Sequence, residues 1–320
     1  MRPGAPVGAS EVPPAGASGV PLTLRNAAIA TGFSIGYLLL AAWLTGYKTD
    51  QLVLVLLFNG LFYLSGVTRR FILGFTVFII FWVLFDSMKA FPNYRYNAVR
   101  IESLYRLEKR LFGIGGQTLN EYWLGHRTTF LDVLTGICYL CWIPLPLAFA
   151  GYLFYRNKEW LFRYTLSFLL VNLLGFVIYY VYPAAPPWYV QEYGFVFHPH
   201  TPGNVAGLGR FDSFFHVAVF SALYSKSSNV FAAMPSLHAA YPLTVLYYGM
   251  KFRLGRINIL FALIMAGIWF AAVYNSHHYV LDVIAGIACG LAGIWLFNLL
   301  YTKVGRFNRL VKGWAQALQP

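Results

Sequence analysis

Apolar runs of membrane-spanning length alternate with short polar segments along almost the whole chain. An α-helix needs roughly 20 apolar residues to cross the hydrocarbon layer of a bilayer, and eight runs meet or approach this length. They cover residues 27–46, 51–67, 71–90, 130–155, 161–182, 234–252, 257–275 and 279–300. The pattern predicts an all-α fold, a polytopic membrane helix bundle with about eight transmembrane helices.

Composition supports this class. Hydrophobic residues make up 58% of the chain and charged residues only 11%, which excludes an ordinary soluble domain. Aromatic residues contribute 19%, and many stand near the ends of the runs, as in the interfacial belts of membrane helices. The runs are too long for the strands of a transmembrane β-barrel.

Charge indicates which helix ends share a side of the membrane. The chain carries 24 Lys and Arg against 11 Asp and Glu, a net charge of +13, and topology accounts for these bases without a nucleic-acid partner. Four basic segments are predicted to be cytoplasmic by the positive-inside rule, namely residues 68–70, 155–163, 251–256 and 303–320. The segments on the opposite side are then residues 91–129, 183–233 and 275–278. The bases between Lys89 and Arg127 conflict with this topology, but long amphipathic segments follow the rule weakly.

We expect four parts in the chain. Residues 1–24, rich in Pro, Gly, Ala and Ser, form a flexible tail. Residues 25–129 hold the first transmembrane helices and an amphipathic helix on the bilayer surface, residues 130–302 form a membrane core, and residues 303–320 form a basic cytoplasmic tail. The apolar face of the amphipathic helix contains Ile101, Leu104, Leu107, Leu111 and Phe112.

Ionisable residues inside apolar runs are candidates for chemistry, since a bilayer makes them costly. In "HHYVLD", residues 277–282, His278 and Asp282 stand four residues apart. One helical turn sets both side chains on one face, where a carboxylate can orient an imidazole. The alternative is a polar pair that only holds helices together. Asp86 and Asp132 lie near helix ends, where capping or hydration accounts for them.

A second motif lies upstream, in "FAAMPSLHAAYPL" at residues 231–243. Pro235 and Ser236 stand at the start of an apolar run and His238 follows in its first turn, where free N–H groups favour an anion. Together the two motifs predict a phosphoryl-transfer site in which His278 is the nucleophile, Asp282 orients it, and His238 is the acid and base. No metal or cofactor is required, although a metal held by His277, His278 and His238 is an alternative.

These motifs resemble the second and third motifs of the type 2 phosphatidic acid phosphatase superfamily, over residues 130–300. Such a resemblance implies a six-helix-type phosphatase or phosphotransferase core. Two departures stand out: Ala271 and Ala272 occupy the Ser-Arg positions of the third motif, and "YVYPAAPPWYV" at 180–190 lacks the bases of the first. The phosphate-clamping bases of a lipid phosphatase are therefore missing.

The departures resemble the inositol phosphorylceramide synthase branch, which carries Ala-Pro-Pro-Trp-Tyr, Pro-Ser-Leu-His and His-His-Tyr-x-x-Asp. All three are present, at 185–189, 235–238 and 277–282. This resemblance implies a transferase that moves a phospho-alcohol, best matched by phosphoinositol, from a glycerophospholipid to a ceramide-like hydroxyl through a phosphohistidine, releasing diacylglycerol. A lipid phosphatase of the same superfamily is the second interpretation. A channel, scramblase or assembly factor without activity is the third.

Further residues are candidates for substrate binding. Besides Pro235, Ser236 and His277, they are Arg210, Trp188 and Tyr189. Arg210 lies in a Gly-rich loop between the motifs, and aromatic faces suit a sugar-like ring, although exposed loop bases and interfacial aromatics are common. Gly286 and Gly290 have the spacing of close helix packing. We expect a bacterial inner membrane, or a Golgi membrane in a eukaryote, with the site on the periplasmic or luminal side.

Overall fold

The computed structural model describes residues 20–226 and 229–319, so most of the predicted N-terminal tail lies outside the described residues. Helices from the apolar runs are α1 (Leu24–Thr45), α2 (Thr49–Leu64), α3 (Gly66–Gly74), α4 (Thr76–Ser87), α7 (Thr129–Leu140), α8 (Pro144–Arg156), α9 (Lys158–Val181), α13 (Leu237–Lys251), α14 (Ile257–Tyr274) and α15 (Val280–Lys303). The others are η1 (Met88–Ala90), η2 (Asn93–Arg95), α5 (Glu102–Phe112), α6 (Leu119–Gly125), α10 (Pro187–Tyr193), η3 (Ala206–Leu208), α11 (Gly209–Phe215), α12 (Val219–Tyr224) and α16 (Gly305–Ala317). In the described part of the chain, β-structure is limited to isolated bridges, so the all-α prediction is confirmed.

Five to six stretches of the described chain are long and apolar enough to cross a membrane, and the protein is therefore a multi-pass membrane protein. The five are α1, α7 together with α8, α9, α14 and α15, and the bent pair α3 and α4 makes a sixth. Helix α2 has 16 residues. Helix α13 has 15 residues and contains Pro242. These two helices are shorter than the spans predicted at 51–67 and 234–252.

Helix breaks interrupt three of the predicted runs, although the run at 130–155 keeps its outer bounds as one candidate span, Thr129–Arg156. The Ser65 hydroxyl accepts the Thr68 N–H, a capping bond that starts α3 at Gly66 and ends the run predicted to reach residue 67. At the break between α3 and α4 the chain bends, so that the two helices stand at 50° to each other. The run predicted at 130–155 is divided into α7 and α8, because Pro144 begins a new helix.

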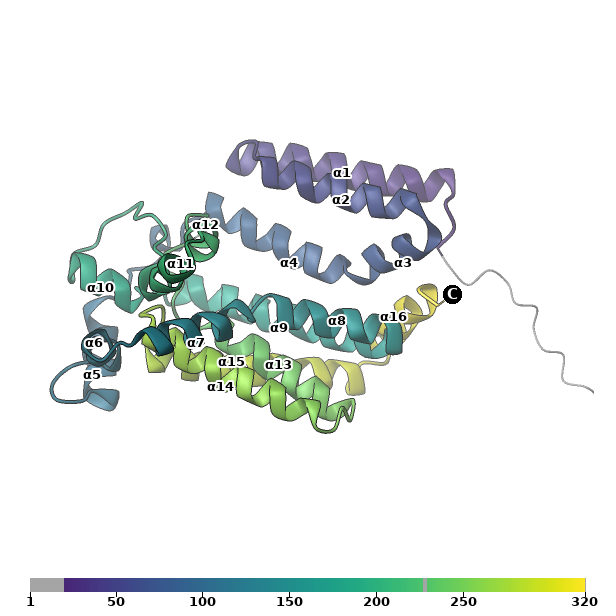
Figure 1. The fold of residues 1–320 in the computed structure, drawn as a ribbon. Coiled ribbons are helices and arrows are strands. Elements are labelled where there is room, and N and C mark those ends of the chain that lie inside the picture. The colour runs from purple at the N-terminus through teal and green to yellow at the C-terminus, as the bar shows by residue number, and fades with distance from the viewer. Residues whose placement is uncertain (1–19, 227–228, 320) are drawn as a thin grey trace, which may run out of the picture.

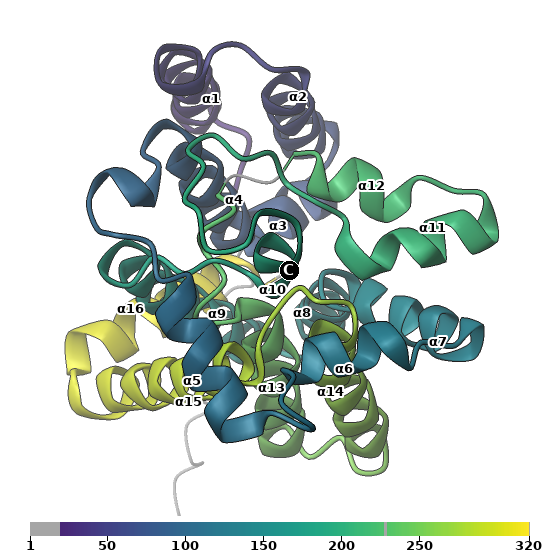
Figure 2. The same ribbon diagram turned by 90° about the vertical axis from the view of Figure 1, so that its left-hand side faces the viewer.

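Helices α9, α13, α14 and α15 form the packed centre of the bundle (Figure 1). Small residues allow the closest approaches: a Cβ on Gly293 of α15 would lie 2.8 Å from the Cα of Val171 in α9. Leu161, Tyr164 and Phe297 are fully buried in this centre. By contrast, α1 and α2 stand to one side (Figure 2), and only 17% of the apolar window of α1 is buried, which suits a lipid-facing hairpin.

The two ends of the bundle differ in composition. The four basic segments lie at the end marked by α3 and α16, whereas α5, α6, α10, α11 and α12 gather at the other end (Figures 1 and 2). The sequence predicted this grouping of helix ends. The histidine motifs belong to the second end, because α13 begins there, one residue before His238, and residues 275–279 connect α14 to α15.

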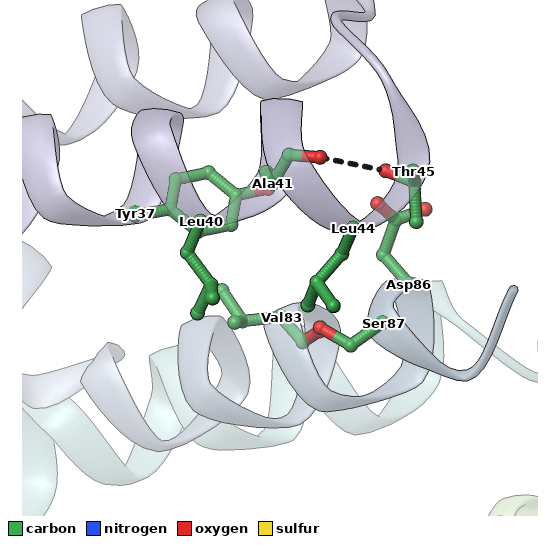
Figure 3. A pocket seen from close by; sticks show the side chains of 8 residues that line it. All are labelled: Tyr37, Leu40, Ala41, Leu44, Thr45, Val83, Asp86 and Ser87. Atoms are coloured by element: carbon green, nitrogen blue, oxygen red, sulfur yellow. Dashed lines mark hydrogen bonds between the residues drawn. The ribbon is translucent and has the colours of Figure 1, made fainter. Parts of the chain in front are cut away.

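A small cavity lies between α1 and α4, away from those motifs. Its volume is about 10 Å³ and Tyr37, Leu44 and Asp86 are among its lining residues (Figure 3). Asp86 pairs with Lys89 at 2.7 Å, in keeping with the structural interpretation of this acid. A cavity of this size holds about one water molecule, so it cannot take a lipid headgroup.

Candidate active site

The turn after α14 places the two adjacent histidines. The N–H of Ser276 donates to the Val273 carbonyl (3.1 Å) and the N–H of His277 to the Ala272 carbonyl (3.0 Å). These are the two bonds of a Schellman motif, and Ser276 takes the left-handed position with φ 60°. The N–H of His278 donates to the Ala272 carbonyl as well (3.0 Å), so the end of α14 determines where His278 stands.

His278 lies before α15, which corrects the expectation that it shares a helical turn with Asp282. Tyr279 is the N-cap and Val280 the first helical residue. Asp282 reaches back over the helix start, and its Oδ2 accepts the Tyr279 N–H at 2.8 Å. The same Oδ2 lies 3.6 Å from Nδ1 of His278. The predicted proximity is therefore observed, but a helix cap produces it.

His238 completes the arrangement from α13. It is the second residue of that helix, and its Nδ1 lies 3.1 Å from Nε2 of His278. Helices α13 and α15 are joined at this level, because the Ser236 N–H donates to the Asp282 carbonyl at 2.8 Å. His278 thus has the Asp282 carboxylate near its Nδ1 and the His238 imidazole at its Nε2.

The site is enclosed by protein. Asp282 is 0% exposed, and His277 and His278 are each 5% exposed. The His277 ring stacks on that of Tyr224 and on that of Tyr139, and its Nε2 lies 3.0 Å from the Val205 carbonyl. Burial, and then the neighbouring His278, lower the pKa of His277 to about 3. His277 is therefore neutral at physiological pH and links the turn to the segment before η3.

Gly286 makes the close approach of α13 and α15 possible. A Cβ at this position would lie 2.1 Å from the Ser236 carbonyl oxygen, which confirms the close packing predicted from the small residues. A Cβ on Gly290 would lie 3.3 Å from the Ala240 Cβ. The backbones of the two motifs touch here, so no side-chain movement can relieve a larger residue at position 286.

Replacing Gly286 with alanine is expected to lower the thermal stability of the protein, because it forces the two backbones apart. Overpacking of this kind costs about 1–3 kcal/mol, which corresponds to a Tm several degrees lower in detergent. The matched control is Gly151→Ala in α8, where a Cβ meets nothing within 4 Å. An unchanged Tm for Gly286→Ala would contradict the tight contact.

The predicted binding residues fall into two groups. Ser236 belongs to the histidine cluster: it is 0% exposed and its Oγ has no hydrogen-bond partner among the described residues. Pro235 precedes it, two residues before α13 begins. Trp188 and Tyr189 pack instead in a cluster with Phe231. The Tyr189 hydroxyl is used locally, because it donates to the Val196 carbonyl at 2.8 Å and accepts the His198 N–H at 2.7 Å.

Arg210 is held beside the turn after α14 and not against the histidine rings. Its Nε donates to Asp132 at 2.7 Å, and its Nη2 lies 3.5 Å from the Asn275 side chain. Asp132 stands in the first turn of α7, as expected for an acid near a helix start, and also accepts the Tyr274 hydroxyl at 2.8 Å. This network supports Asn275, the C-cap of α14.

Three polar residues at the site carried no motif in the sequence. The Tyr139 hydroxyl of α7 lies 3.1 Å from Nδ1 of His238. The Asn120 amide of α6 donates to the carbonyls of Val273 and His278, at 2.7 and 3.0 Å. Glu108 of α5 binds the start of α15. Their only sequence signal is a polar residue on an otherwise apolar helix face, which is too common to single them out.

The side chains do not form a metal centre in the part of the chain that the structure describes. No three histidine, cysteine or carboxylate side chains converge there as metal ligands. In particular, His277 turns toward Val205 while His238 and His278 face each other. In the described residues, the three histidines considered for a metal are therefore not gathered as one group of ligands.

The protein is a multi-pass helical bundle, and at one of its ends two histidines contact each other with an aspartate beside one of them. Residues 102–296 match the PAP2 superfamily, and because this is more than half of the chain, the protein belongs to that superfamily. The resemblance predicted from the two motifs is confirmed.

Individual relatives show which members of the superfamily this chain is similar to. The chain is 44% identical over 270 residues to the phosphoinositol dihydroceramide synthase of Bacteroides thetaiotaomicron, covering 82% of this chain and 87% of the relative. It is 28% identical to the inositol phosphorylceramide synthase catalytic subunit of Saccharomyces cerevisiae, covering 73% of this chain and 58% of the relative. For the inositol phosphorylceramide synthase of Candida albicans the identity is 27%, covering 75% and 51%. No solved structure matches the chain significantly.

Proposed function

We propose that this protein transfers phosphoinositol from phosphatidylinositol to the hydroxyl group of ceramide or dihydroceramide, releasing diacylglycerol. The observation that carries the proposal is the pairing of His238 with His278 at 3.1 Å. The pair lies in a chain 44% identical to a phosphoinositol dihydroceramide synthase. Two imidazoles in contact, one of them beside a buried carboxylate, suit a transfer that needs a nucleophile and a separate acid and base.

In the first half-reaction His278 Nε2 attacks the phosphorus of the donor. The bond from phosphorus to the diacylglycerol oxygen breaks, and His238 gives its proton to that oxygen. Asp282, whose Oδ2 lies 3.6 Å from Nδ1 of His278, stabilises the positive charge that develops on the ring. The products are diacylglycerol and a phosphoinositol group bound to His278.

The second half-reaction reverses these roles. His238, now lacking its proton, takes the proton of the ceramide hydroxyl. The resulting oxygen attacks phosphorus, and the bond from phosphorus to Nε2 of His278 breaks. The donor and the product are both phosphodiesters with one negative charge each, so the site needs fewer bases than one that binds a phosphomonoester with nearly two.

Transfer is favoured over the hydrolysis of a phosphomonoester by the residues around the histidines. Ala271 and Ala272, at the Ser-Arg positions of the phosphatase motif, are both 0% exposed. Their carbonyls receive the N–H groups of residues 275, 277 and 278, so these positions support the turn and carry no charge. This supports a transferase over a lipid phosphatase of the same superfamily.

Candidate contacts to the phosphoryl group lie close to the histidine pair. The Ser236 Oγ, which has no hydrogen-bond partner among the described residues, is a donor for a phosphoryl oxygen, at the start of α13 where the helix dipole favours an anion. Arg210, already paired with Asp132, acts at longer range, and Trp188 and Tyr189 border the headgroup from the cluster they form with Phe231.

We also propose the membrane arrangement. Helices α2 and α13 cross the bilayer together with the other spans, which makes eight in total, and basic segments at the α3 and α16 end favour the cytoplasmic side for that end. The histidine site then opens on the opposite face. A bacterial relative favours the inner membrane, with the site on the periplasmic side.

The direct test supplies membranes containing the protein with labelled ceramide or dihydroceramide and a panel of phospholipids. Mass spectrometry is expected to find a phosphoinositol sphingolipid and diacylglycerol in equal amounts, with phosphatidylinositol as the preferred donor. Phosphatidylethanolamine and phosphatidylcholine serve as matched donors that differ only in the headgroup.

Different outcomes would identify the alternatives. Free phosphate released from phosphatidic acid, without sphingolipid product, would establish a lipid phosphatase. Absence of any lipid conversion by well-folded protein would favour a channel, scramblase or assembly factor that retains the fold.

A further inference from the structure

Glu108 is a buried carboxylate outside both histidine motifs. It lies on the amphipathic helix α5 and is 0% exposed, whereas Leu107 and Leu111 on the same helix are 44% and 56% exposed. Buried acids are rare unless they are partnered. Because α5 buries this glutamate and exposes two leucines, the reason for the burial must be the contacts that the glutamate makes.

Both oxygens of Glu108 bind the start of the helix that carries Asp282. Oε1 accepts the Val280 N–H at 3.0 Å and Oε2 accepts the Leu281 N–H at 3.1 Å. These groups belong to the first turn of α15, where helix N–H groups have no partner within the helix. The pKa of Glu108 is raised by burial, and the two N–H groups lower it in part.

The two bonds lie between the residues that form the proposed nucleophile and its orienting acid. Tyr279, Val280 and Leu281 stand between His278 and Asp282, and the first of them donates its N–H to Asp282 itself. Three consecutive N–H groups are therefore held by two carboxylates. A rotation of this turn would move the Asp282 carboxylate away from Nδ1 of His278, which is already 3.6 Å distant.

We propose that Glu108 is a positioning residue that holds the first turn of α15 so that Asp282 stays directed at His278. This inference rests on the proposed transferase activity. Glu108 touches neither histidine ring and acts through Asp282. Helix α5, at the end of the bundle where the site lies (Figure 1), thereby becomes part of the catalytic apparatus.

The test is a double-mutant cycle of Glu108→Gln and Asp282→Asn. Glutamine retains one acceptor and turns an NH₂ group toward the second backbone N–H, which breaks one bond with little change in volume. We expect kcat per folded protein to fall about 10- to 100-fold, with the KM for both lipids changed less than about twofold. In the Asp282→Asn background, Glu108→Gln is expected to lower kcat by less than about threefold, because both changes remove the same effect of Asp282 on His278.

The matched control is Glu102→Gln on the same helix, since Glu102 is exposed and its ion pair in the described chain is with the exposed Arg106. This control is expected to retain wild-type kcat. Wild-type kcat in Glu108→Gln, or the full loss repeated in the Asp282→Asn background, would overturn the proposal. If Glu108→Gln does not fold, Glu108→Asp replaces it, with the charge kept and the reach one methylene shorter.

The outcomes separate this inference from the proposed function. If wild-type protein transfers phosphoinositol and Glu108→Gln equals it, only the inference fails. If wild-type protein converts no lipid, the proposed function fails and the inference falls with it. If neither variant at position 108 folds, Glu108 is needed for folding and the positioning role is rejected.

Discussion

Replacing His278 with alanine is expected to abolish transfer, to less than about 10⁻⁴ of the wild-type rate. The variant lacks the Nε2 atom that would attack phosphorus. The neighbouring imidazoles do not replace it, because His238 belongs to a different helix, α13, and His277 directs its Nε2 at the Val205 carbonyl. Intact-mass measurement after mixing with phosphatidylinositol should show a phosphoinositol adduct on wild-type protein and none on the variant.

The fold should survive this change. The backbone of residue 278 is held by the Ala272 carbonyl and by Asn120, which do not involve the imidazole. An exposed histidine, replaced as His200→Ala, is the matched control and is expected to retain both the adduct and the activity. Normal turnover by His278→Ala, in protein with wild-type Tm, would refute the proposed nucleophile.

The second large effect is expected from Asp282→Asn, which should lower kcat about 10²- to 10⁴-fold. The single asparagine oxygen can still accept the Tyr279 N–H that Oδ2 accepts now, so the helix start is retained. What is lost is the negative charge near Nδ1 of His278, and with it the stabilisation of the charged ring. Rapid-quench kinetics should show slower formation of the adduct, with KM little changed.

Asp50→Asn provides the control for this variant, because Asp50 is an exposed acid paired with Lys226 at 3.1 Å. Its activity should equal that of wild type. An Asp282→Asn protein with unchanged kcat would show that Asp282 serves only to cap α15, and the charge-based role would have to be abandoned.

The sequence predicted the bundle and the histidine cluster because both depend on strong, local signals. Apolar runs of span length are uncommon outside membrane proteins, and the motifs at 235–238 and 277–282 carry their residues at fixed spacings. The helix breaks at Ser65 and Pro144 were not predicted, because a single Ser or Pro in an apolar run does not by itself end a membrane helix.

Contacts made through the backbone, or between segments far apart in the chain, could not be predicted in this way. His278 and Asp282 were expected on one helical turn, but a capping bond across the start of α15 brings them together. Glu108 was not singled out, because its partners are backbone N–H groups, which carry no sequence signature. The role of Arg210 also depended on a distant residue, Asp132, with which it forms an ion pair.

The attachment of Glu108 to α15 has a consequence for biosynthesis. Its partner Val280 comes 172 residues later in the chain, and during synthesis N-terminal segments are made and begin to fold first. Until the last span is made, α5 carries a carboxylate whose final partners do not yet exist, and burying it early would be costly. We therefore expect α5 to remain at the water-exposed surface of the membrane until α15 is inserted. The site then forms as one of the last steps of assembly, so a chain truncated before α15 should leave α5 open to proteases.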